Sequence, residues 1–403
     1  MGGLWRRFFC WGNFIMRKIL ACSLSTLLAG TVLNQQSVPK EALLSFEEIC
    51  EFRGYRSESH EVTTEDGYKL TLFHLKSSIP ATKPPILLVH GLTHTATTFI
   101  INQSTKGPAF RLLDESHDVW LLNTRGNFLS RRHQTLDPKT KEYWNWTSNE
   151  IGKFDLPATI DHILQLTHSP KINYLGHSQG GFVIMFCLAT RPEYSSKVNL
   201  AALFAPPGGG QITTKVPYLN SVLDPKFLES LENDKVFFIA DKTPGLNVLA
   251  SDVFNNIESA EKYKDRYDYS LLNEDPSVLI VYLNHFCGGT SATNLKYFRQ
   301  FLDRNSQFVY CFDFGEAINL QKYGSKDPPI VDFGQIGSKL AVFYGKYDGV
   351  CSSENGENLL GLLPKDKVVW AKLDYELDHS GFTVSPYQQH MDDLIRLLDQ
   401  HSF

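Results

Sequence analysis

The 403-residue sequence contains no Cys-x-x-Cys pair, no block of like charges and no internal repeat. Without such cysteine pairs a structural zinc site is not expected, and we predict no metal site. The net charge of −5 is spread over mixed signs, so nothing points to nucleic acid as a partner. What is left is a globular protein, 42 % hydrophobic, that is long enough to bury a full core unaided.

The N-terminal segment has a different character from the rest of the chain. The positively charged start Met16–Lys18 precedes the apolar run Ile19–Leu33, which is too short to cross a membrane comfortably. This order is typical of a secretory signal, so we predict a leader over residues 1–37 and a secreted or lysosomal destination. An uncleaved signal anchor is the alternative, and the sequence does not decide whether Met1 or Met16 is the start.

Two sequons agree with such a compartment, and the cysteines allow at most two disulfides. Five cysteines follow the leader, an odd number that leaves at least one thiol unpaired, and the candidate disulfide joins Cys287 and Cys311. The sequons at Asn102 and Asn145 make these residues candidates for N-glycosylation.

Strand-like runs alternate with helix-like segments along most of the chain. Continuous apolar runs are typical of parallel strands that are covered on both faces. We therefore predict an α/β fold with a mostly parallel, doubly wound sheet, preceded by a hairpin. We also expect a helix capped by Asp155 and a last helix over Tyr387–Gln400. The predicted strands are His60–Val62, Tyr68–His74, Ile86–Val89, Asp118–Leu122, Asn173–Leu175, Leu200–Phe204, Leu340–Tyr344 and Val368–Leu373.

The alternation stops between Pro206 and about Asp332, in a stretch rich in aromatic residues. It is too long for a plain loop, and we interpret it as an inserted, largely helical cap or lid domain. The predicted organisation is a leader at 1–37, a first core part at 38–205, the cap at 206–332 and a second core part at 333–403.

The pentapeptide Gly176-His177-Ser178-Gln179-Gly180 carries the main chemical signal. It fits Gly-x-Ser-x-Gly between a predicted strand and a helix-competent run, which is the setting of a nucleophile elbow. Ser178 would occupy a strained turn, and the glycines on either side would let the backbones pass. His177 is expected to pack beneath this elbow rather than to transfer protons.

An elbow serine needs an oxyanion hole made of two backbone N–H groups. One should be that of Gln179, directly after the nucleophile. The other should come from the loop after the strand Ile86–Val89, and Leu92 is the candidate. His90 in the same loop is interpreted as a brace for the turn.

The base and its orienting acid should follow the nucleophile along the chain. His379 lies in a loop after the run Val368–Leu373, where a base at the carboxyl edge of a parallel sheet belongs. Asp348 follows the preceding strand and is the predicted acid, while Asp378 is the rival. Ser178, His379 and Asp348 would then act as nucleophile, general base and orienting carboxylate.

Several stretches together resemble the acid lipases, the family of gastric and lysosomal acid lipases. The resemblance covers about residues 44–396, and it implies the α/β-hydrolase fold. The stretches are Val62–Tyr68, His90–Leu92, Asp118–Leu121, Asn123–Asn127, Ser130–His133, Lys153–Asp161, the elbow, Gly289–Ser291 and Asn294.

What the resemblance implies is hydrolysis of triacylglycerols or cholesteryl esters at a membrane, lipid-droplet or emulsion interface, without a cofactor. The family's triad and oxyanion donors fall on the residues named above. Three departures from the family pattern are Thr93-His94-Thr95, Ser380-Gly381-Phe382 and Ala205-Pro206-Pro207-Gly208-Gly209-Gly210. The alternatives are a carboxylesterase for small soluble esters and a catalytically silent lipid-binding protein. The oligomeric state stays open.

Overall fold

A computed structural model describes residues 39–77, 81–102, 106–208, 217–239, 276–286, 288–304 and 306–403. Residues 38–403 form one compact unit. The predicted leader lies outside the described residues, so its processing stays a prediction. Within the described ranges, no helix combines the length and apolar character that a membrane span requires.

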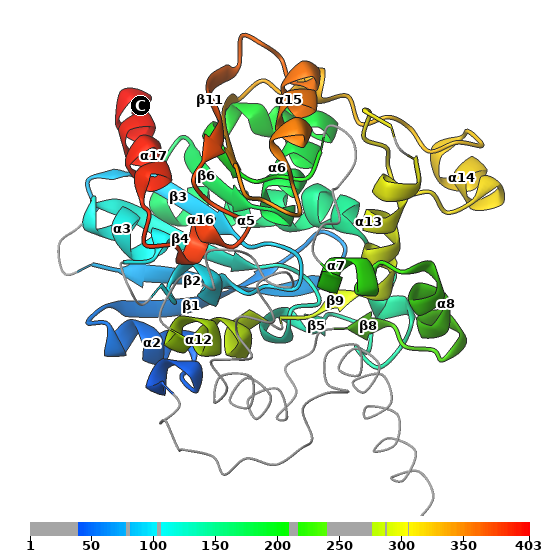
Figure 1. Ribbon diagram of the computed structural model, residues 1–403, viewed down its shortest axis with the longest axis horizontal. Helices are drawn as coiled ribbons and strands as arrows, with labels where there is room; N and C mark the ends of the chain where they lie inside the picture. Colours follow the sequence, from blue (N-terminus) through cyan, green and yellow to red (C-terminus); the bar gives the residue numbers. More distant parts are fainter. Residues whose placement is uncertain are drawn as a thin grey trace, which may run out of the picture. The chain divides into compact units, whose positions relative to one another are not determined.

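The core is a single large sheet whose strand order is β1-β2-β4-β3-β6-β7-β10-β11, with the short β5 paired to β2 (Figure 1). β1, β2 and β4 pair antiparallel, and every pairing from β4 through β3 to β11 is parallel. This confirms the predicted mostly parallel sheet with its hairpin. The bounds are β1 (Arg56–Thr63), β2 (Tyr68–Lys76), β3 (Lys83–Val89), β4 (His117–Asn123), β5 (Arg132–His133), β6 (Ile172–His177), β7 (Val198–Phe204), β10 (Lys339–Gly345) and β11 (Val368–Tyr375).

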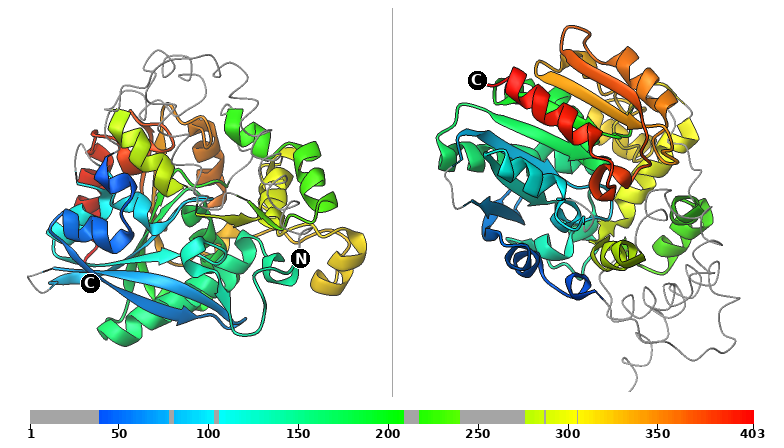
Figure 2. Two further views of the ribbon diagram at one scale, coloured as in Figure 1. Left: turned by 90° about the horizontal axis from the view of Figure 1, so that it is seen from below. Right: turned by 60° about the vertical axis from the view of Figure 1, so that its left-hand side comes forward.

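Helices flank this sheet, as the two views of Figure 2 show. On one side α3 and α17 are linked by an ion pair between Arg111 and Asp392 at 2.7 Å. α6, which follows the elbow, packs against β6 and β7, and α15 packs against β10 and β11. The helices of the core are α2 (Phe46–Phe52), α3 (Pro108–Asp114), α4 (Ser148–Glu150), α5 (Leu156–Thr167), α6 (Gln179–Thr190), α15 (Ser353–Leu362), α16 (Gly381–Val384) and α17 (Gln389–Gln400).

The described parts of the predicted cap are mostly helical and include a two-stranded sheet of β8 and β9. α7 packs on α8 and α8 on α13, a group that lies beside the main sheet in Figure 1. Whether this segment moves as a lid stays a prediction. Its elements are α7 (Pro217–Val222), α8 (Pro225–Asn233), β8 (Phe238–Ile239), α12 (Pro276–Phe286), β9 (Thr290–Ser291), α13 (Ala292–Arg304) and α14 (Glu316–Tyr323).

The start of α5 differs from the prediction. Asp155 was expected to cap this helix, but it has helical backbone angles and ends a π-helical turn over Ile151–Asp155. Its side chain forms no cap. It is fully buried and accepts hydrogen bonds from the backbone N–H and the Nε–H of Arg125. Because the Asp155 carboxylate is paired with Arg125, it does not cap the helix.

Candidate active site

The elbow has the strained geometry that its sequence predicts. Ser178 lies between β6 and α6 with φ 52° and ψ −121°, a region that side chains rarely adopt. A Cβ on Gly176 would lie 2.4 Å from the Gly180 carbonyl carbon, and one on Gly180 would lie 2.1 Å from the Val89 carbonyl oxygen. Both positions therefore require glycine, because α6 passes too closely to β6 at Gly176 and to β3 at Gly180 for any side chain.

We expect Gly180→Ala to lower both the stability and the activity of the protein. The new methyl group must push β3 away from α6, and overpacking of this kind costs about 1–3 kcal/mol. Gly361→Ala in α15 is the matched control, since a Cβ there meets nothing within 4 Å. That change should stabilise the protein by roughly 0.5–1 kcal/mol. Urea unfolding of both variants measures the difference, and equal effects would contradict the steric argument.

Asp348 and His379 lie in contact, although they come from different loops at one edge of the sheet. Oδ2 of Asp348 accepts a hydrogen bond from Nδ1 of His379 at 2.8 Å. Oδ1 accepts the backbone N–H groups of Val350 and Cys351, both at 2.7 Å. Both oxygens of the Asp348 carboxylate thus accept hydrogen bonds. The bond to Nδ1 fixes the orientation of the His379 imidazole, and Nε2 is the nitrogen left to act as the base.

The rival acid, Asp378, has a different environment. It is fully buried, and its Oδ1 accepts the backbone N–H of Gly381 at 2.7 Å, at the start of α16. Its role at this oxygen is to hold the turn that carries His379. The geometry favours Asp348 as the orienting acid.

The His379 loop also contacts the elbow directly. Nε2 of His177 donates to the backbone carbonyl of His379 at 2.8 Å, and the two imidazole rings lie 4.9 Å apart between centroids. Ser178 and His379 are both 8 % exposed, and Asp348 is 6 % exposed. The structure therefore gathers the nucleophile, base and acid candidates at one nearly closed place, with His177 joining the two loops.

The loop after β3 reaches the same place. A Cβ on Gly91 would lie 3.1 Å from Cβ of Ser178, so this loop passes directly over the serine. Leu92 is the next residue, and Gln179 is the first residue of α6. His90 braces the turn as expected, because its Nδ1–H donates to the Gly91 carbonyl at 2.8 Å.

Comparison with known proteins agrees with this geometry. The family model described as "alpha/beta hydrolase fold" matches residues 84–384, and that described as "Partial alpha/beta-hydrolase lipase region" matches residues 46–103. Lipase member K of Homo sapiens is 30 % identical over 96 % of this chain and 99 % of its own length. The chain belongs to the acid lipase family. Gastric triacylglycerol lipase of Mus musculus is 32 % identical over 80 % of this acid lipase and 84 % of its own length.

Solved structures agree on the fold. The lip1 protein of Acinetobacter baumannii AYE aligns with a TM-score of 0.52 at 16 % identity, over 91 % of this acid lipase and 98 % of that chain. At this level of identity the likeness supports the α/β-hydrolase fold and nothing finer.

The Gln179 side chain belongs to a polar network that sequence reasoning missed. Its Oε1 accepts hydrogen bonds from Asn294 Nδ2 at 2.8 Å and from Ser148 Oγ at 3.1 Å. Asn294 Oδ1 in turn accepts the backbone N–H of Ser148 at 2.7 Å. All three residues are buried, and α13 is thereby tied to the first turn of α6. Asn294 was noted only as part of a family-like stretch, and nothing in the sequence marked Ser148.

A second network starts from His94, a departure of this acid lipase from its family pattern. Nδ1 of His94 lies 3.3 Å from Thr98 Oγ1, and Nε2 lies 3.2 Å from the Tyr282 hydroxyl. The same hydroxyl lies 3.2 Å from Oγ of Ser380, the residue after His379. The loop at His94 and the loop at Ser380 are therefore connected through α12, a pairing that no local motif could predict.

Buried histidines surround the elbow and are held neutral. Burial lowers the pKa of His90 to about 4, although the hydrogen bond to the Gly91 carbonyl by itself raises this pKa. Burial and the nearby His379 lower the pKa of His177 to about 3. The bonds of His90 agree with this state, because its Nε2 accepts the Thr124 backbone N–H at 3.3 Å and would lose that bond on protonation.

The free energy of unfolding should therefore fall as the pH falls from about 6.5 to about 4. Over this window the unfolded chain takes up a proton on His90 that the folded chain refuses, so low pH favours unfolding. One such group contributes up to about 1.4 kcal/mol per pH unit. We expect His90→Gln to flatten this slope in urea unfolding at pH 6.5, 5.5 and 4.5. The exposed His168, changed to Asn, is the control and should leave the slope unchanged.

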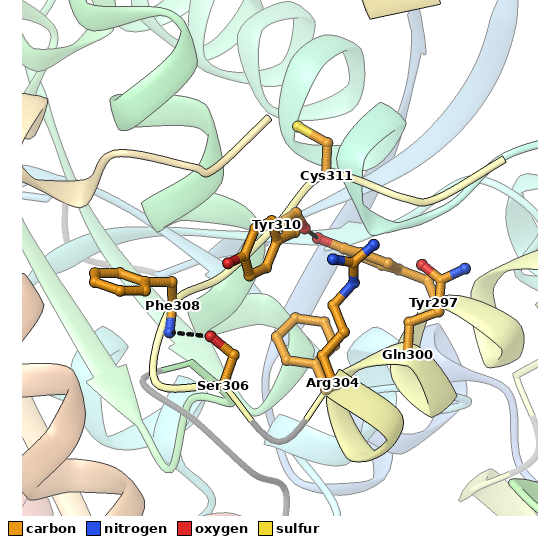
Figure 3. A pocket seen from close by; sticks show the side chains of 8 residues that line it. Tyr297, Gln300, Arg304, Ser306, Phe308, Tyr310 and Cys311 are labelled. Atoms are coloured by element: carbon orange, nitrogen blue, oxygen red, sulfur yellow. Dashed lines mark hydrogen bonds between the residues drawn. The ribbon is translucent and has the colours of Figure 1, made fainter. Parts of the chain in front are cut away.

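A hollow beside α13 is lined by none of these residues (Figure 3). Its free volume of about 10 Å³ admits a single water molecule and no acyl chain. Arg304 covers the Tyr310 ring at 4.6 Å from the centroid. The lining residues are Tyr297, Gln300, Phe301, Arg304, Ser306, Phe308, Tyr310 and Cys311.

The predicted disulfide between Cys287 and Cys311 is wrong for this structure. Cys311 is a free thiol that lines the hollow, and burial raises its pKa to about 11. Its backbone N–H donates to the Pro329 carbonyl, which fixes it in a segment beside Asn149 and Tyr297. Cys287 itself lies outside the described residues. Cys50 and Cys187 are free and buried, and Cys351 is buried as well.

The two glycosylation candidates differ in accessibility. Asn102 is fully buried, and its Nδ2 donates to the Ser385 carbonyl at 3.0 Å. A glycan on this nitrogen would have to displace the segment before α17, so the structure contradicts the prediction for Asn102. Asn145 is exposed at the end of a 3-10 turn and remains a candidate.

Proposed function

We propose that this acid lipase hydrolyses carboxylic esters of lipids through an acyl-enzyme formed on Ser178. The observation that carries the proposal is the 2.8 Å hydrogen bond between Asp348 and His379, in a loop whose carbonyl is bonded to the residue before Ser178. An acid, a base and a strained serine at one buried edge of the sheet are what nucleophilic acyl transfer requires.

Each residue has a definite part in the proposed reaction. His379 takes the proton of Ser178 as the hydroxyl oxygen attacks the ester carbonyl, and Asp348 stabilises the imidazolium that forms. The N–H groups of Leu92 and Gln179 would then stabilise the oxyanion, and one such donor is typically worth about 2.7–4 kcal/mol. His379 returns the proton to the leaving alcohol, and water, activated by the same base, later releases the fatty acid.

Lipid esters are favoured over small soluble esters for two reasons. The relatives over most of the chain include proteins named as triacylglycerol lipases. In addition, Tyr282 and Phe286 of α12 pack their rings against His94, so aromatic side chains of the proposed cap lie beside the site. We extend the proposal to triacylglycerols or cholesteryl esters, presented at a membrane, lipid-droplet or emulsion surface.

The same proposal includes the secretory pathway, with a secreted or lysosomal destination, because of the leader at 1–37. A glycan on the exposed Asn145 would accompany this route. The segment 206–332 is proposed to be the cap that shields the site from water.

Two measurements on the purified protein test the function. Hydrolysis of emulsified triolein, cholesteryl oleate and p-nitrophenyl butyrate measures substrate class, and a fluorophosphonate probe followed by peptide mapping identifies the reactive serine. We expect hydrolysis of at least one lipid ester and an adduct on Ser178. Hydrolysis of the soluble ester alone would favour a carboxylesterase, and no adduct would favour a silent lipid-binding protein.

A further inference from the structure

The strand register brings a second group of polar side chains together on one face of the sheet, away from Ser178. Glu58 on β1 is the direct cross-strand partner of His74 on β2, and His74 is the partner of Trp120 on β4. His60 lies two residues after Glu58, and Asp118 lies two residues before Trp120, so both are on the same face. Five residues from three strands thus form one cluster, although they are dispersed over more than sixty positions of the chain.

Three of these side chains point their ligand atoms at one another. Oε1 of Glu58 lies 3.1 Å from Nε2 of His60 and 3.2 Å from Nδ1 of His74. All three atoms lie within 4.8 Å of one another. Ligand bonds of about 2.0–2.1 Å in a tetrahedron around Zn²⁺ separate neighbouring ligand atoms by about 3.3 Å, which is close to the separations found here.

The other nitrogen of His74 is bound in the manner of a metal ligand. Its Nε2 lies 2.5 Å from Oδ1 of Asp118, whose Oδ2 accepts the indole N–H of Trp120 at 2.9 Å. Trp120 also stacks on the imidazole of His74 with 3.6 Å between the centroids. A carboxylate on the far nitrogen fixes the tautomer and orientation of metal-binding histidines.

This tautomer turns the lone pair of His74 Nδ1 toward Glu58. If Nε2–H of His74 donates to Asp118, the lone pair of Nδ1 points toward Oε1 of Glu58, another acceptor. Two acceptors 3.2 Å apart are stable only with a proton or a metal ion between them. Imidazole and carboxylate together are preferred by first-row divalent metals, among them Zn²⁺.

We propose that Glu58, His60 and His74 form a binding site for a divalent transition metal of the Zn²⁺ type. A nearby fourth donor is available, since Nε2 of His162 on α5 is buried without a partner among the described residues. Its ring lies edge-on to that of His60, with 5.6 Å between the centroids. Rotation of His162, or a water molecule, would complete the coordination.

Lys76 is the group that competes with the metal. Its Nζ lies 2.5 Å from the same Oε1 of Glu58, and its side chain is 40 % exposed. A divalent ion would displace this ammonium group, which can turn toward water at little cost. The site should therefore bind metal more tightly when Lys76 is replaced by Met.

The place of the cluster indicates a structural role. Asp118 and Trp120 lie near the amino end of β4, whereas Ser178 follows the carboxyl end of the parallel β6. β1 is the edge strand of the sheet. A metal held by β1 and β2 and supported by β4 would clamp this edge without touching the chemistry.

The test uses the full-length protein after chelation, with ZnCl₂ as the titrant in calorimetry and CoCl₂ as a spectroscopic probe. We expect one strongly bound Zn²⁺ per chain, a tetrahedral Co²⁺ absorption band and a higher Tm with metal. Glu58→Gln and His60→Asn should weaken binding at least tenfold, and Asp118→Asn about 10- to 100-fold through the orientation of His74. His168→Asn, an exposed histidine elsewhere, should change nothing.

Two results would overturn the proposal. One is the absence of Zn²⁺ binding by the unmodified protein at micromolar metal. The other is equal binding by all cluster variants, which would assign the metal to another place such as His379. Because Glu58 is on the surface, Glu58→Gln is expected to fold normally, and its Tm without metal checks this. Ester hydrolysis plays no part in the readout, so this test stands or falls separately from the proposed function.

Discussion

Ser178→Ala is expected to lower kcat for ester hydrolysis by about 10⁶-fold while the protein remains folded. The hydroxyl is the proposed nucleophile, and no neighbouring group can take its place on the strained turn. Its removal should leave the fold intact because the residue is small and its backbone strain is unchanged by alanine. Initial rates on an emulsified triacylglycerol, together with a thermal melt, measure both parts of the expectation.

Changes at the two aspartates near His379 are expected to lower activity to different degrees. Asp348→Asn should cost about 10⁴-fold in kcat, since the amide can donate to Nδ1 and stabilise the wrong tautomer of His379. Asp378→Asn is the matched control, because Asp378 accepts the Gly381 backbone N–H, whereas Nδ1 of His379 donates to Asp348. Asp378→Asn should affect stability more than the pH dependence of kcat.

Non-additivity provides the sharper criterion. If Ser178, His379 and Asp348 act as one unit, the double variant Ser178→Ala/His379→Ala should be no slower than Ser178→Ala alone. A double variant that is slower by the product of the single losses would mean independent roles. Substantial activity in Ser178→Ala would remove the acyl-enzyme mechanism altogether.

The elbow could be predicted from sequence because its causes are local. Glycines that must let β3 and α6 pass, and a serine between strand and helix, are all contained in five consecutive residues. The strands were predictable for a similar reason, since continuous apolar runs record burial on both faces. The order of serine, acid and base along the chain then predicts Asp348 as the acid and His379 as the base.

What the sequence could not provide were pairings across long separations. Asp155 has the character of a helix cap, but Arg125 is a stronger partner and is thirty residues away. Asn102 has the sequon pattern, yet packing against the segment at Ser385 buries it. The Glu58, His60 and His74 cluster depends on the register between β1 and β2, which no spacing rule reveals.

Arg125 is a position at which a change should damage stability severely. Its side chain is 1 % exposed and binds two carboxylates at once, Asp155 through Nε at 2.7 Å and Asp66 through both terminal nitrogens at 2.7 and 2.8 Å. Its guanidinium also lies 4.0 Å above the Tyr68 ring. Burial lowers the pKa of Arg125, but the negative charges of Asp155 and Asp66 raise it by more. The pKa of Arg125 therefore lies above its ordinary value. The residue joins the hairpin turn after β1 to the start of α5.

Arg125→Met should therefore destabilise the protein by about 3–5 kcal/mol, because it leaves the fully buried Asp155 without its counter-charge. Arg125→Lys should rescue little, since a single ammonium cannot serve two carboxylates in a fork geometry. Arg132→Met is the matched control: its ion pair with Glu61 also measures 2.7 Å, but the side chain is 56 % exposed, so the loss should stay within about 1 kcal/mol. Adding Asp155→Asn to Arg125→Met should recover part of the loss, because the uncompensated charge is then gone. Urea unfolding of these variants decides the matter: similar losses for Arg125→Met and Arg132→Met would show that burial does not set the strength of this ion pair.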